Sequence, residues 1–167
     1  MKTPNEYREM EFIELFIALA KLYKPKVYVE LGVKKGYTIR RMAPFVEKAI
    51  GVDIVPVAID IPNVTMIQGT TVEVAKSWMG REPFIDMLFI DANHDATAVF
   101  HDVAAYFPYV MPGTGLILMH DTHPIREELL TKEFCSNAWE AAHHLSVSGK
   151  STQIEIVGRL TSPNMPA

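Results

Sequence analysis

The sequence lacks several features that would place the protein outside the ordinary globular class. It contains one cysteine, Cys135, so an intramolecular disulfide is excluded, and a lone thiol is typical of a reducing compartment. No apolar run approaches the ~20 residues that span a bilayer. The first residues, MKTPNEYREMEF, have no apolar core of the kind found in signal peptides. We therefore expect a cytoplasmic protein that does not enter a membrane.

An excess of positive charge is also missing. The 16 basic residues are outnumbered by 20 acidic ones, which argues against a nucleic-acid groove. The chain has 167 residues, of which 49% are hydrophobic and 22% charged, enough for one domain with a sizeable core. We expect a single domain over 1–167, with an N-terminal helix (1–24), a core (25–158) and a polar tail (159–167).

The order of hydrophobic patterns predicts alternating strands and helices. Thr3, Pro4 and Glu6 mark the start of the first helix as a cap, a first-turn proline and a capping-box acid, and Pro25 marks its end. Strands are predicted at 26–31, 49–53, 64–67, 85–91, 116–120 and 154–157, and further helices at 37–46, 72–79, 96–107 and 139–145. Alternation of this kind, with continuous apolar strands, indicates an α/β fold: a Rossmann-like, doubly wound, mostly parallel sheet with helices on both faces.

Ligands of such sheets bind outside the carboxyl ends of the strands. The first predicted strand ends in the pattern E-x-G-x-x-x-G, formed by Glu30, Gly32 and Gly36, and the second ends in Asp53, where an acid can bind ribose hydroxyls. A dinucleotide loop would read G-x-G-x-x-G, but Lys34 stands at its middle glycine. The initial carboxylate favours a ligand with a cationic amine over a diphosphate. Alternatively, the two glycines serve only the turn.

A second group of polar residues follows the fourth and fifth predicted strands. These strands end in FIDANHD and MHDTHP, so Asp91 and Asp121 would project from neighbouring strands about 4.8 Å apart. Two carboxylates this close repel each other unless a cation lies between them or one is protonated. Magnesium suits such oxygen ligands. Alternatively, Asp91 caps the next helix, although Asp95 lies nearer its start, and Asp121 is a solvated loop acid or a cap.

The stretches VYVELGVKKGYT and IDANHDATAVFHDVAAYFPYVMPGTGLILMHDT resemble the class I methyltransferases, and within them the metal-dependent O-methyltransferases of the catechol and macrolide-sugar types. The resemblance covers about 27–122 and implies that the chain binds S-adenosylmethionine. The residues it assigns to that cofactor are Glu30, Gly32, Gly36, Tyr37, Thr38, Asp53, Gly69, Thr70, Thr71 and Asp91. Thr70 and Thr71 have an equally good alternative role in capping the following helix.

The resemblance also implies the catalytic groups. In the sugar type a histidine three residues after the first aspartate is the general base, a spacing matched here by Asp91 and His94. A bound cation would lower the pKa of an acceptor hydroxyl and of this histidine, which could then take the proton. His94 is otherwise an exposed loop residue. His120 is either a third metal ligand beside Asp91 and Asp121 or a buried histidine, and a nitrogen ligand would favour manganese or iron over magnesium.

These observations predict metal-assisted O-methylation of a small molecule, with a sugar among the candidate acceptors. A homo-oligomer is compatible with the sequence, whereas a nucleic-acid or membrane partner is not expected. The alternatives are a non-catalytic cofactor-binding module, a truncated inactive relative, or a hydroxylase-like relative that kept the metal site. The family fold ends in an antiparallel strand, but only 154–157 reads as a strand after Asp121. Either the last strand is absent or the sequence stops before it.

Overall fold

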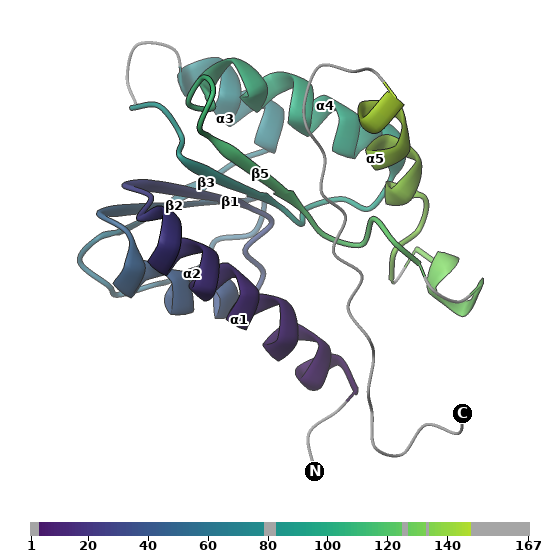
Figure 1. Cartoon of the computed structure of the whole chain (residues 1–167), viewed down its shortest axis with the longest axis horizontal. Helices are drawn as coiled ribbons and strands as arrows, with labels where there is room; N and C mark the ends of the chain where they lie inside the picture. The colour runs from purple at the N-terminus through teal and green to yellow at the C-terminus, as the bar shows by residue number, and fades with distance from the viewer. Residues whose placement is uncertain (1–3, 79–82, 125–126, 133, 148–167) are drawn as a thin grey trace.

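A computed structural model describes residues 4–78, 83–124, 127–132 and 134–147, with residues 4–11 described by their backbone alone. Five strands of this part of the chain form one parallel sheet in the order β3-β2-β1-β4-β5 (Figure 1). The strands are β1 (Val27–Leu31), β2 (Lys48–Asp53), β3 (Val64–Gln68), β4 (Met87–Ile90) and β5 (Leu116–Met119). The predicted strand at 154–157, the polar tail and Thr3 lie outside the described residues.

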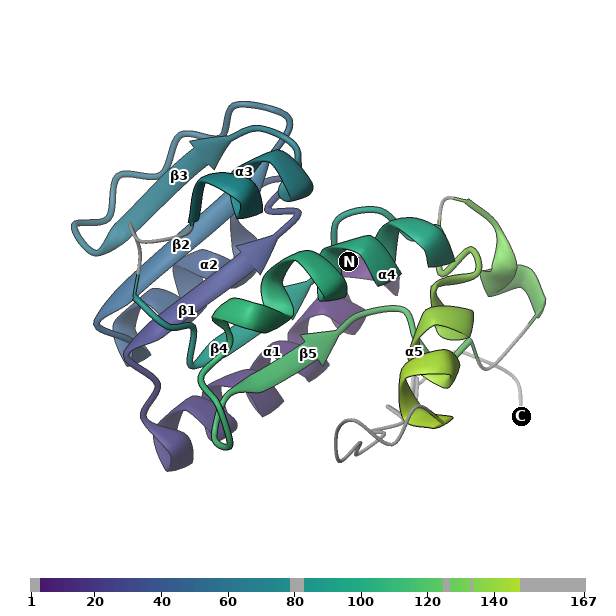
Figure 2. The ribbon, with the colours of Figure 1, turned by 90° about the horizontal axis from the view of Figure 1, so that it is seen from above.

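Helices cover both faces of the sheet, as predicted. α1 and α2 lie on one face and α3, α4 and α5 on the other, an arrangement that Figures 1 and 2 show from two directions. The helices are α1 (Pro4–Tyr23), α2 (Tyr37–Met42), α3 (Thr71–Trp78), α4 (Ala96–Tyr106) and α5 (Ala138–Val147). No helix within the described ranges is both long and apolar enough to cross a membrane.

Each face of the sheet has its own apolar core, because neighbouring side chains of a strand point in opposite directions. Tyr28 and Phe89 pack toward α1 and α2, where the predicted apolar face of α1 is buried, whereas Val29 and Leu88 pack toward α3 and α4. The residues of that α1 face are Ile13, Phe16, Ile17 and Ala20. Every residue of β1 and of β4 is buried, because helices cover both faces of these two strands. This explains their almost continuous apolar sequence.

The element boundaries differ from the predicted ones where proline interrupts a helix. The predicted helix 37–46 ends at Met42 and continues as a 3₁₀ turn, Ala43–Phe45, which contains Pro44. The predicted helix 96–107 likewise ends at Tyr106 and gives way to a 3₁₀ turn, Phe107–Tyr109, around Pro108. Proline has no N–H to continue the α-helical hydrogen bonding, and its ring crowds the preceding turn. A further 3₁₀ turn, Glu127–Leu130, was not predicted.

The sheet order determines where a ligand can bind. β1 pairs with β2 on one side and with β4 on the other. The strand order therefore runs outward in one direction from β1 to β3 and in the opposite direction from β4 to β5. Ligands of doubly wound sheets bind beside this switch point, at the carboxyl ends of the strands. The residues predicted to form the site lie at or after the carboxyl ends of all five described strands, and the topology brings them to one edge of the sheet.

Candidate active site

Gly32 brings the loop after β1, where the cofactor residues are predicted, against the end of β4, where the metal residues are predicted. It lies directly after β1 with φ of +84°, and a Cβ at this position would stand 2.2 Å from the Asp91 carbonyl oxygen and 2.5 Å from Ala92 Cα. Both neighbours are main-chain atoms that cannot turn aside, and positive φ is unfavourable for residues with a side chain. The loop after β1 can therefore lie against the end of β4 only with glycine here, so this glycine has a packing role in addition to its role in the turn.

Asp53, at the end of β2, holds the loop that follows Gly32. Its Oδ2 accepts the main-chain N–H groups of Val33 (2.9 Å) and Lys34 (2.7 Å), and its Oδ1 accepts that of Val55 (2.8 Å). Lys34 has φ of 54°, a conformation in which glycine is normally preferred. The carboxylate thus stabilises the irregular loop directly, while its oxygens keep lone pairs that can accept further hydrogen bonds.

Glu30 is buried in β1, which the sequence did not indicate. The hydroxyl of Tyr28 donates a hydrogen bond of 2.8 Å to Glu30 Oε2. Burial raises the pKa of Glu30 well above its usual range, although the Tyr28 hydrogen bond opposes this shift, and the negative charges of Asp91 and Asp53 raise it further. The carboxyl group therefore favours its neutral form, and a cationic ligand placed nearby would favour the charged form.

The start of α2 follows the second glycine of the loop. Gly36 precedes the helix with φ of +75°, as expected for a residue in a tight turn. Tyr37 is exposed, and its hydroxyl accepts a hydrogen bond from Arg41 (3.3 Å), whereas Thr38 is buried. The resemblance assigns all three residues to the cofactor. The Tyr37 ring is accessible to a ligand, whereas the Thr38 side chain is buried within the protein.

The threonines after β3 both have protein partners. The Thr70 hydroxyl accepts the main-chain N–H of Glu73 (3.3 Å) and donates to Glu73 Oε2 (2.7 Å), which is the side-chain pairing of a helix cap. The Thr71 hydroxyl donates to the carboxylate of Asp102 on α4. The capping alternative thus describes Thr70, and Thr71 links α3 to α4. Gly69 precedes them, and its N–H donates to the Asp53 carbonyl.

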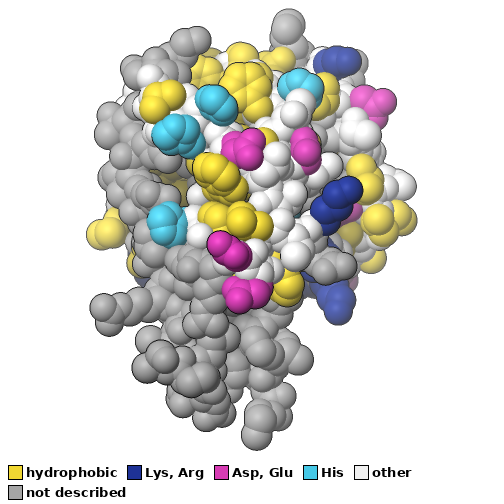
Figure 3. Space-filling view, turned by 90° about the vertical axis from the view of Figure 1, so that its right-hand side faces the viewer, with side chains coloured by type: hydrophobic (Ala, Val, Ile, Leu, Met, Phe, Trp, Pro, Cys, Tyr) yellow, Lys and Arg dark blue, Asp and Glu magenta, His cyan; other side chains and the backbone are white. Residues whose placement is uncertain are grey.

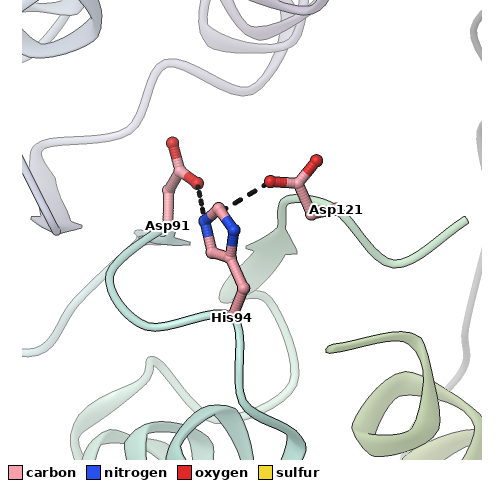
Figure 4. Close-up of side chains that lie close together, drawn as sticks. All are labelled: Asp91, His94 and Asp121. Atoms are coloured by element: carbon pink, nitrogen blue, oxygen red, sulfur yellow. Dashed lines mark ion pairs between the residues drawn. The ribbon is translucent and has the colours of Figure 1, made fainter. Parts of the chain in front are cut away.

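The predicted pair of acids is brought together as the sequence indicated. β4 and β5 are neighbours, and ligand atoms of Asp91, His94 and Asp121 all lie within 4.8 Å of one another (Figure 4). Asp121 has φ of 56°, in the left-handed region that aspartate tolerates better than most residues. Asp95 caps α4 by accepting the main-chain N–H groups of Thr97 (3.0 Å) and Ala98 (3.4 Å), which leaves Asp91 without a capping role.

Two histidine nitrogens approach the same two carboxylate oxygens. His94 Nε2 lies 3.4 Å from both Asp91 Oδ1 and Asp121 Oδ2. His120 Nδ1 lies 3.4 Å from Asp91 Oδ1 and 3.0 Å from Asp121 Oδ2. Neighbouring ligands of an octahedral cation bound at ~2.1 Å are about 3.0 Å apart. Asp91, His94 and Asp121 therefore have the donor chemistry and the mutual spacing of a divalent cation site, and His120 Nδ1 lies beside the same two acids.

The electrostatics of this cluster are those of carboxylates paired with protonated histidines. The hydrogen bond to Asp91 raises the pKa of His94 against the opposing effect of its burial, and Asp121 adds to the rise. His120 has a pKa raised to about 10, because its pairing with Asp121 and Asp91 outweighs its burial. The lowered pKa of His94 expected from the sequence applies to a site that holds a cation; between the carboxylates alone the shift has the opposite sign.

His94 is oriented by a residue that the sequence did not suggest. The main-chain carbonyl of Phe134 contacts its Nδ1. A carbonyl can only accept a hydrogen bond, so Nδ1 must carry the proton, and in the neutral ring Nε2 is then the basic nitrogen. This nitrogen faces Asp91 and Asp121. The contact thus selects the tautomer that either a general base or a metal ligand would need.

Phe134 belongs to a segment, 134–137, that supports the cluster from outside. The thiol of Cys135 donates to Asp121 Oδ1 (3.3 Å), and Asn137 Oδ1 accepts the main-chain N–H of Ala96 at the start of α4 (2.9 Å). These contacts join residues that are 14 and 41 positions apart. The segment has no motif or periodicity, so no sequence signal could have identified it.

The ring of His120 is held by aromatic side chains. Its centroid lies 4.5 Å from that of Phe12, on α1, and 6.1 Å from that of Phe89, on β4. Its Nδ1 atom is buried and makes no hydrogen bond within the described part of the chain. On the surface around this region, histidine and acidic side chains gather beside apolar ones (Figure 3). His120 is thus largely buried, as one of the two sequence-based alternatives has it, and its Nδ1 faces the acids, while its role as a metal ligand stays a prediction.

A family model described as a methyltransferase domain matches residues 29–122, more than half of the chain. The MycE methyltransferase of mycinamycin biosynthesis, solved with Mg, SAH and mycinamycin VI, is 27% identical with a TM-score of 0.51, over 58% of this chain and 28% of MycE. The chain spans about a third of the length of MycE across three such structures. No curated protein gives a significant match.

Two further solved structures share the fold at lower identity. The O-methyltransferase TomG from Streptomyces achromogenes, solved with SAM, is 14% identical with a TM-score of 0.61, over 83% of this chain and 68% of TomG. A chain assigned as an O-methyltransferase from Klebsiella pneumoniae is 19% identical with a TM-score of 0.60, over 86% of this chain and 70% of that one. Because the family model matches more than half of the chain and the sheet is parallel, this chain belongs to the class I methyltransferase domain family.

Proposed function

We propose that the protein transfers the methyl group of S-adenosylmethionine to a hydroxyl of a small-molecule acceptor, assisted by a divalent cation. The observation that carries this proposal is the convergence of Asp91, Asp121 and His94 beside the loop that packs on β4 through Gly32. The MycE structure, with its Mg, SAH and mycinamycin VI, supports it as a relative of the same family. A sugar hydroxyl is therefore the first acceptor class to examine.

The cofactor is proposed to lie over the carboxyl ends of β1 and β2. The loop from Gly32 to Gly36, with Tyr37 beside it, would contact the methionine part, and Asp53 would accept the ribose hydroxyls with its remaining lone pairs. Asp91 would supply negative potential near the sulfonium and the ammonium of the ligand, and Glu30 would add to it once the bound cation favours its charged form. Gly69, whose N–H donates to the Asp53 carbonyl, would approach the adenosine part.

The acceptor is proposed to bind on the other side of the switch point. Asp91 and Asp121 would hold the cation, which when bound would supply Lewis acidity that lowers the pKa of the acceptor hydroxyl. His94 Nε2 takes the hydroxyl proton, while Phe134 keeps Nδ1 protonated. The hydroxyl oxygen then forms a bond to the methyl carbon as the carbon–sulfur bond breaks, so the donor leaves as a neutral thioether and the proton stays on His94. In-line alignment of the oxygen, methyl group and sulfur supplies much of the remaining rate enhancement.

Calorimetric titration of the protein with S-adenosylhomocysteine, with and without magnesium or manganese, tests the cofactor part of this proposal. We expect saturable binding of S-adenosylhomocysteine and none of NAD under the same conditions. Tight NAD binding without a response to S-adenosylhomocysteine would overturn it.

A mass-spectrometric assay with S-adenosylmethionine then tests methyl transfer, using mycinamycin VI and catechol as acceptors. Methylation of either one that requires Asp91 and the cation is the expected result. A protein that binds S-adenosylhomocysteine but transfers no methyl group to a wide panel of hydroxyl acceptors would instead be a non-catalytic cofactor-binding module.

A further inference from the structure

We propose that His120 is a direct ligand of the cation and that the site therefore selects a transition-metal dication, such as Mn²⁺, Fe²⁺ or Co²⁺, over Mg²⁺. The inference rests on the cation site of the proposed function and specifies its chemistry. It concerns residues of this chain alone, and metal binding can be measured without cofactor or acceptor.

The Nδ1 atom of His120 lies close to both acids. Nδ1 lies 3.0 Å from Asp121 Oδ2 and 3.4 Å from Asp91 Oδ1, but no hydrogen bond to this buried atom is formed within the described residues. The nitrogen is thus held beside both carboxylates by charge and packing, without a hydrogen bond of good geometry to either. Coordination of a cation shared with the two carboxylates would satisfy this nitrogen, and the separations are close to those between neighbouring ligands of one ion.

The surroundings of the two histidines separate their roles. The His120 side chain is 19% exposed, and its ring packs against Phe12 and Phe89, so its nitrogen can face the carboxylates but cannot move out toward an acceptor. The His94 side chain is 25% exposed and comes from the loop between β4 and α4 (Figure 4). His120 is thus placed as a fixed ligand, whereas His94 remains available for proton transfer.

Metal selectivity follows from the nature of the donor. Mg²⁺ is a hard cation that prefers oxygen ligands and water, and it gains little from imidazole. Divalent transition metals accept carboxylate and imidazole together, and their affinity for nitrogen-containing sites rises from Mn²⁺ to Co²⁺. Two carboxylate oxygens with one fixed imidazole nitrogen therefore make a site in which Mg²⁺ is the weaker competitor.

Calorimetric titration with MnCl₂, CoCl₂ and MgCl₂ tests this selectivity in the protein without cofactor. The wild-type protein should bind Mn²⁺ at least about 10-fold more tightly than Mg²⁺. His120→Ala should weaken Mn²⁺ binding by more than about 100-fold, beyond the effect typical of losing a group that only orients a ligand. His120→Glu should restore binding but shift the preference toward Mg²⁺, and the exposed His144→Gln on α5 should leave both affinities unchanged. Circular dichroism of each variant checks that it is folded.

Pulsed electron paramagnetic resonance of the Mn²⁺-loaded protein identifies the nitrogen directly. Modulation from a coordinated imidazole should be present in the wild type and in His94→Gln, and absent in His120→Glu. Equal affinities for Mn²⁺ and Mg²⁺ in the wild type, or modulation that persists in folded His120→Glu, would overturn the assignment.

The outcome is distinguishable from failure of the proposed function. Selective Mn²⁺ binding through His120 in a protein that ignores S-adenosylhomocysteine would sustain this inference and refute the methyl transfer. A protein that binds S-adenosylhomocysteine and methylates an acceptor with Mg²⁺ and Mn²⁺ bound equally well would sustain the function and refute the selectivity.

Discussion

The two halves of the candidate site are built in different ways. On the side of β1 and β2, the carboxylate of Asp53 is paired with main-chain N–H groups, and Gly32 packs against main-chain atoms of β4. On the side of β4 and β5, side chains of two acids and two histidines face one another. The β1–β2 half is a loop whose main chain is stabilised by one carboxylate. The β4–β5 half is a cluster of ionisable side chains in which each group shifts the pKa of its neighbours.

This difference indicates what each half is suited to bind. Main-chain hydrogen bonds give the β1–β2 side a defined shape, which suits a large ligand that is recognised along its length. The β4–β5 side concentrates two carboxylates beside two imidazole rings, which suits a small cation that displaces the imidazole protons. Substitutions should therefore change shape and stability on one side, and charge and chemistry on the other.

The largest effect is expected from His94→Ala on the β4–β5 side. Turnover with a true acceptor should fall by about 10²–10⁴-fold, the usual contribution of a positioned base. Affinity for S-adenosylhomocysteine should stay within about twofold, because the proposed cofactor contacts come mainly from β1 to β3. Steady-state kinetics and calorimetry on the same variant measure both, with His144→Ala as the control. Full turnover in His94→Ala would leave this residue without a role in proton transfer.

Gly32→Ala tests the backbone character of the β1–β2 side. The new Cβ would clash with the main chain of Asp91 and Ala92 at a positive φ, so the free energy of unfolding should fall by about 3 kcal/mol. Gly113→Ala is a matched control, because Gly113 has φ of +77° but no atom within 4 Å of the added Cβ.

Denaturant unfolding of both glycine variants separates the clash from the conformational cost. The control should lose only the cost of positive φ, about 1–2 kcal/mol. Equal losses in the two variants would show that the contact between the two loops contributes nothing.

Asp53→Ala should weaken cofactor binding, with a smaller change in free energy than the effects expected for His94→Ala and Gly32→Ala. The change removes three hydrogen bonds to the loop main chain together with the proposed ribose contact, so affinity for S-adenosylhomocysteine should fall by about 1–3 kcal/mol. Calorimetry measures this loss, and the exposed Asp60→Ala in the loop after β2 is the control. An unchanged affinity in Asp53→Ala would remove this residue from the cofactor site.

The smallest effect, and the one most specific in its pH dependence, concerns Glu30. Its pKa is raised in the folded protein, mainly by burial, so the folded state holds a proton that the unfolded state releases above pH ~4.3. Stability from this group is therefore present at lower pH and is lost as the pH rises toward the raised pKa. The slope is at most about 1.4 kcal/mol per pH unit.

Glu30→Gln should remove this part of the pH dependence. Urea unfolding between pH 4.5 and about 7 should show a flatter profile in Glu30→Gln than in the wild type or in the exposed Glu128→Gln. Identical profiles in all three proteins would mean that Glu30 titrates as an exposed carboxyl group does.

Much of the fold followed from the sequence because its signals are local. The apolar strands, the prolines and the alternation of elements predict a parallel sheet with helices on both faces, and β1 to β5 lie close to their predicted positions. The ends of the α2 and α4 helices were predicted too late, since the 3₁₀ turns around Pro44 and Pro108 continue the same apolar pattern. The loop after β1 was predicted as a cofactor site from its glycine spacing, and that role stays a prediction. The burial of Glu30 and the capping role of Thr70 depend on neighbours that spacing does not reveal.

By itself, the sequence determined the residue types at the strand ends and the fold that brings those ends to one edge, because both depend on periodicity and spacing along the chain. Only the tertiary structure decided how these side chains are oriented. It placed His120 against Phe12, linked His94 to Phe134, and set Cys135 beside Asp121. Such contacts join loops and helices far apart in the chain, and irregular segments of this kind leave no repeating pattern from which their packing could be predicted.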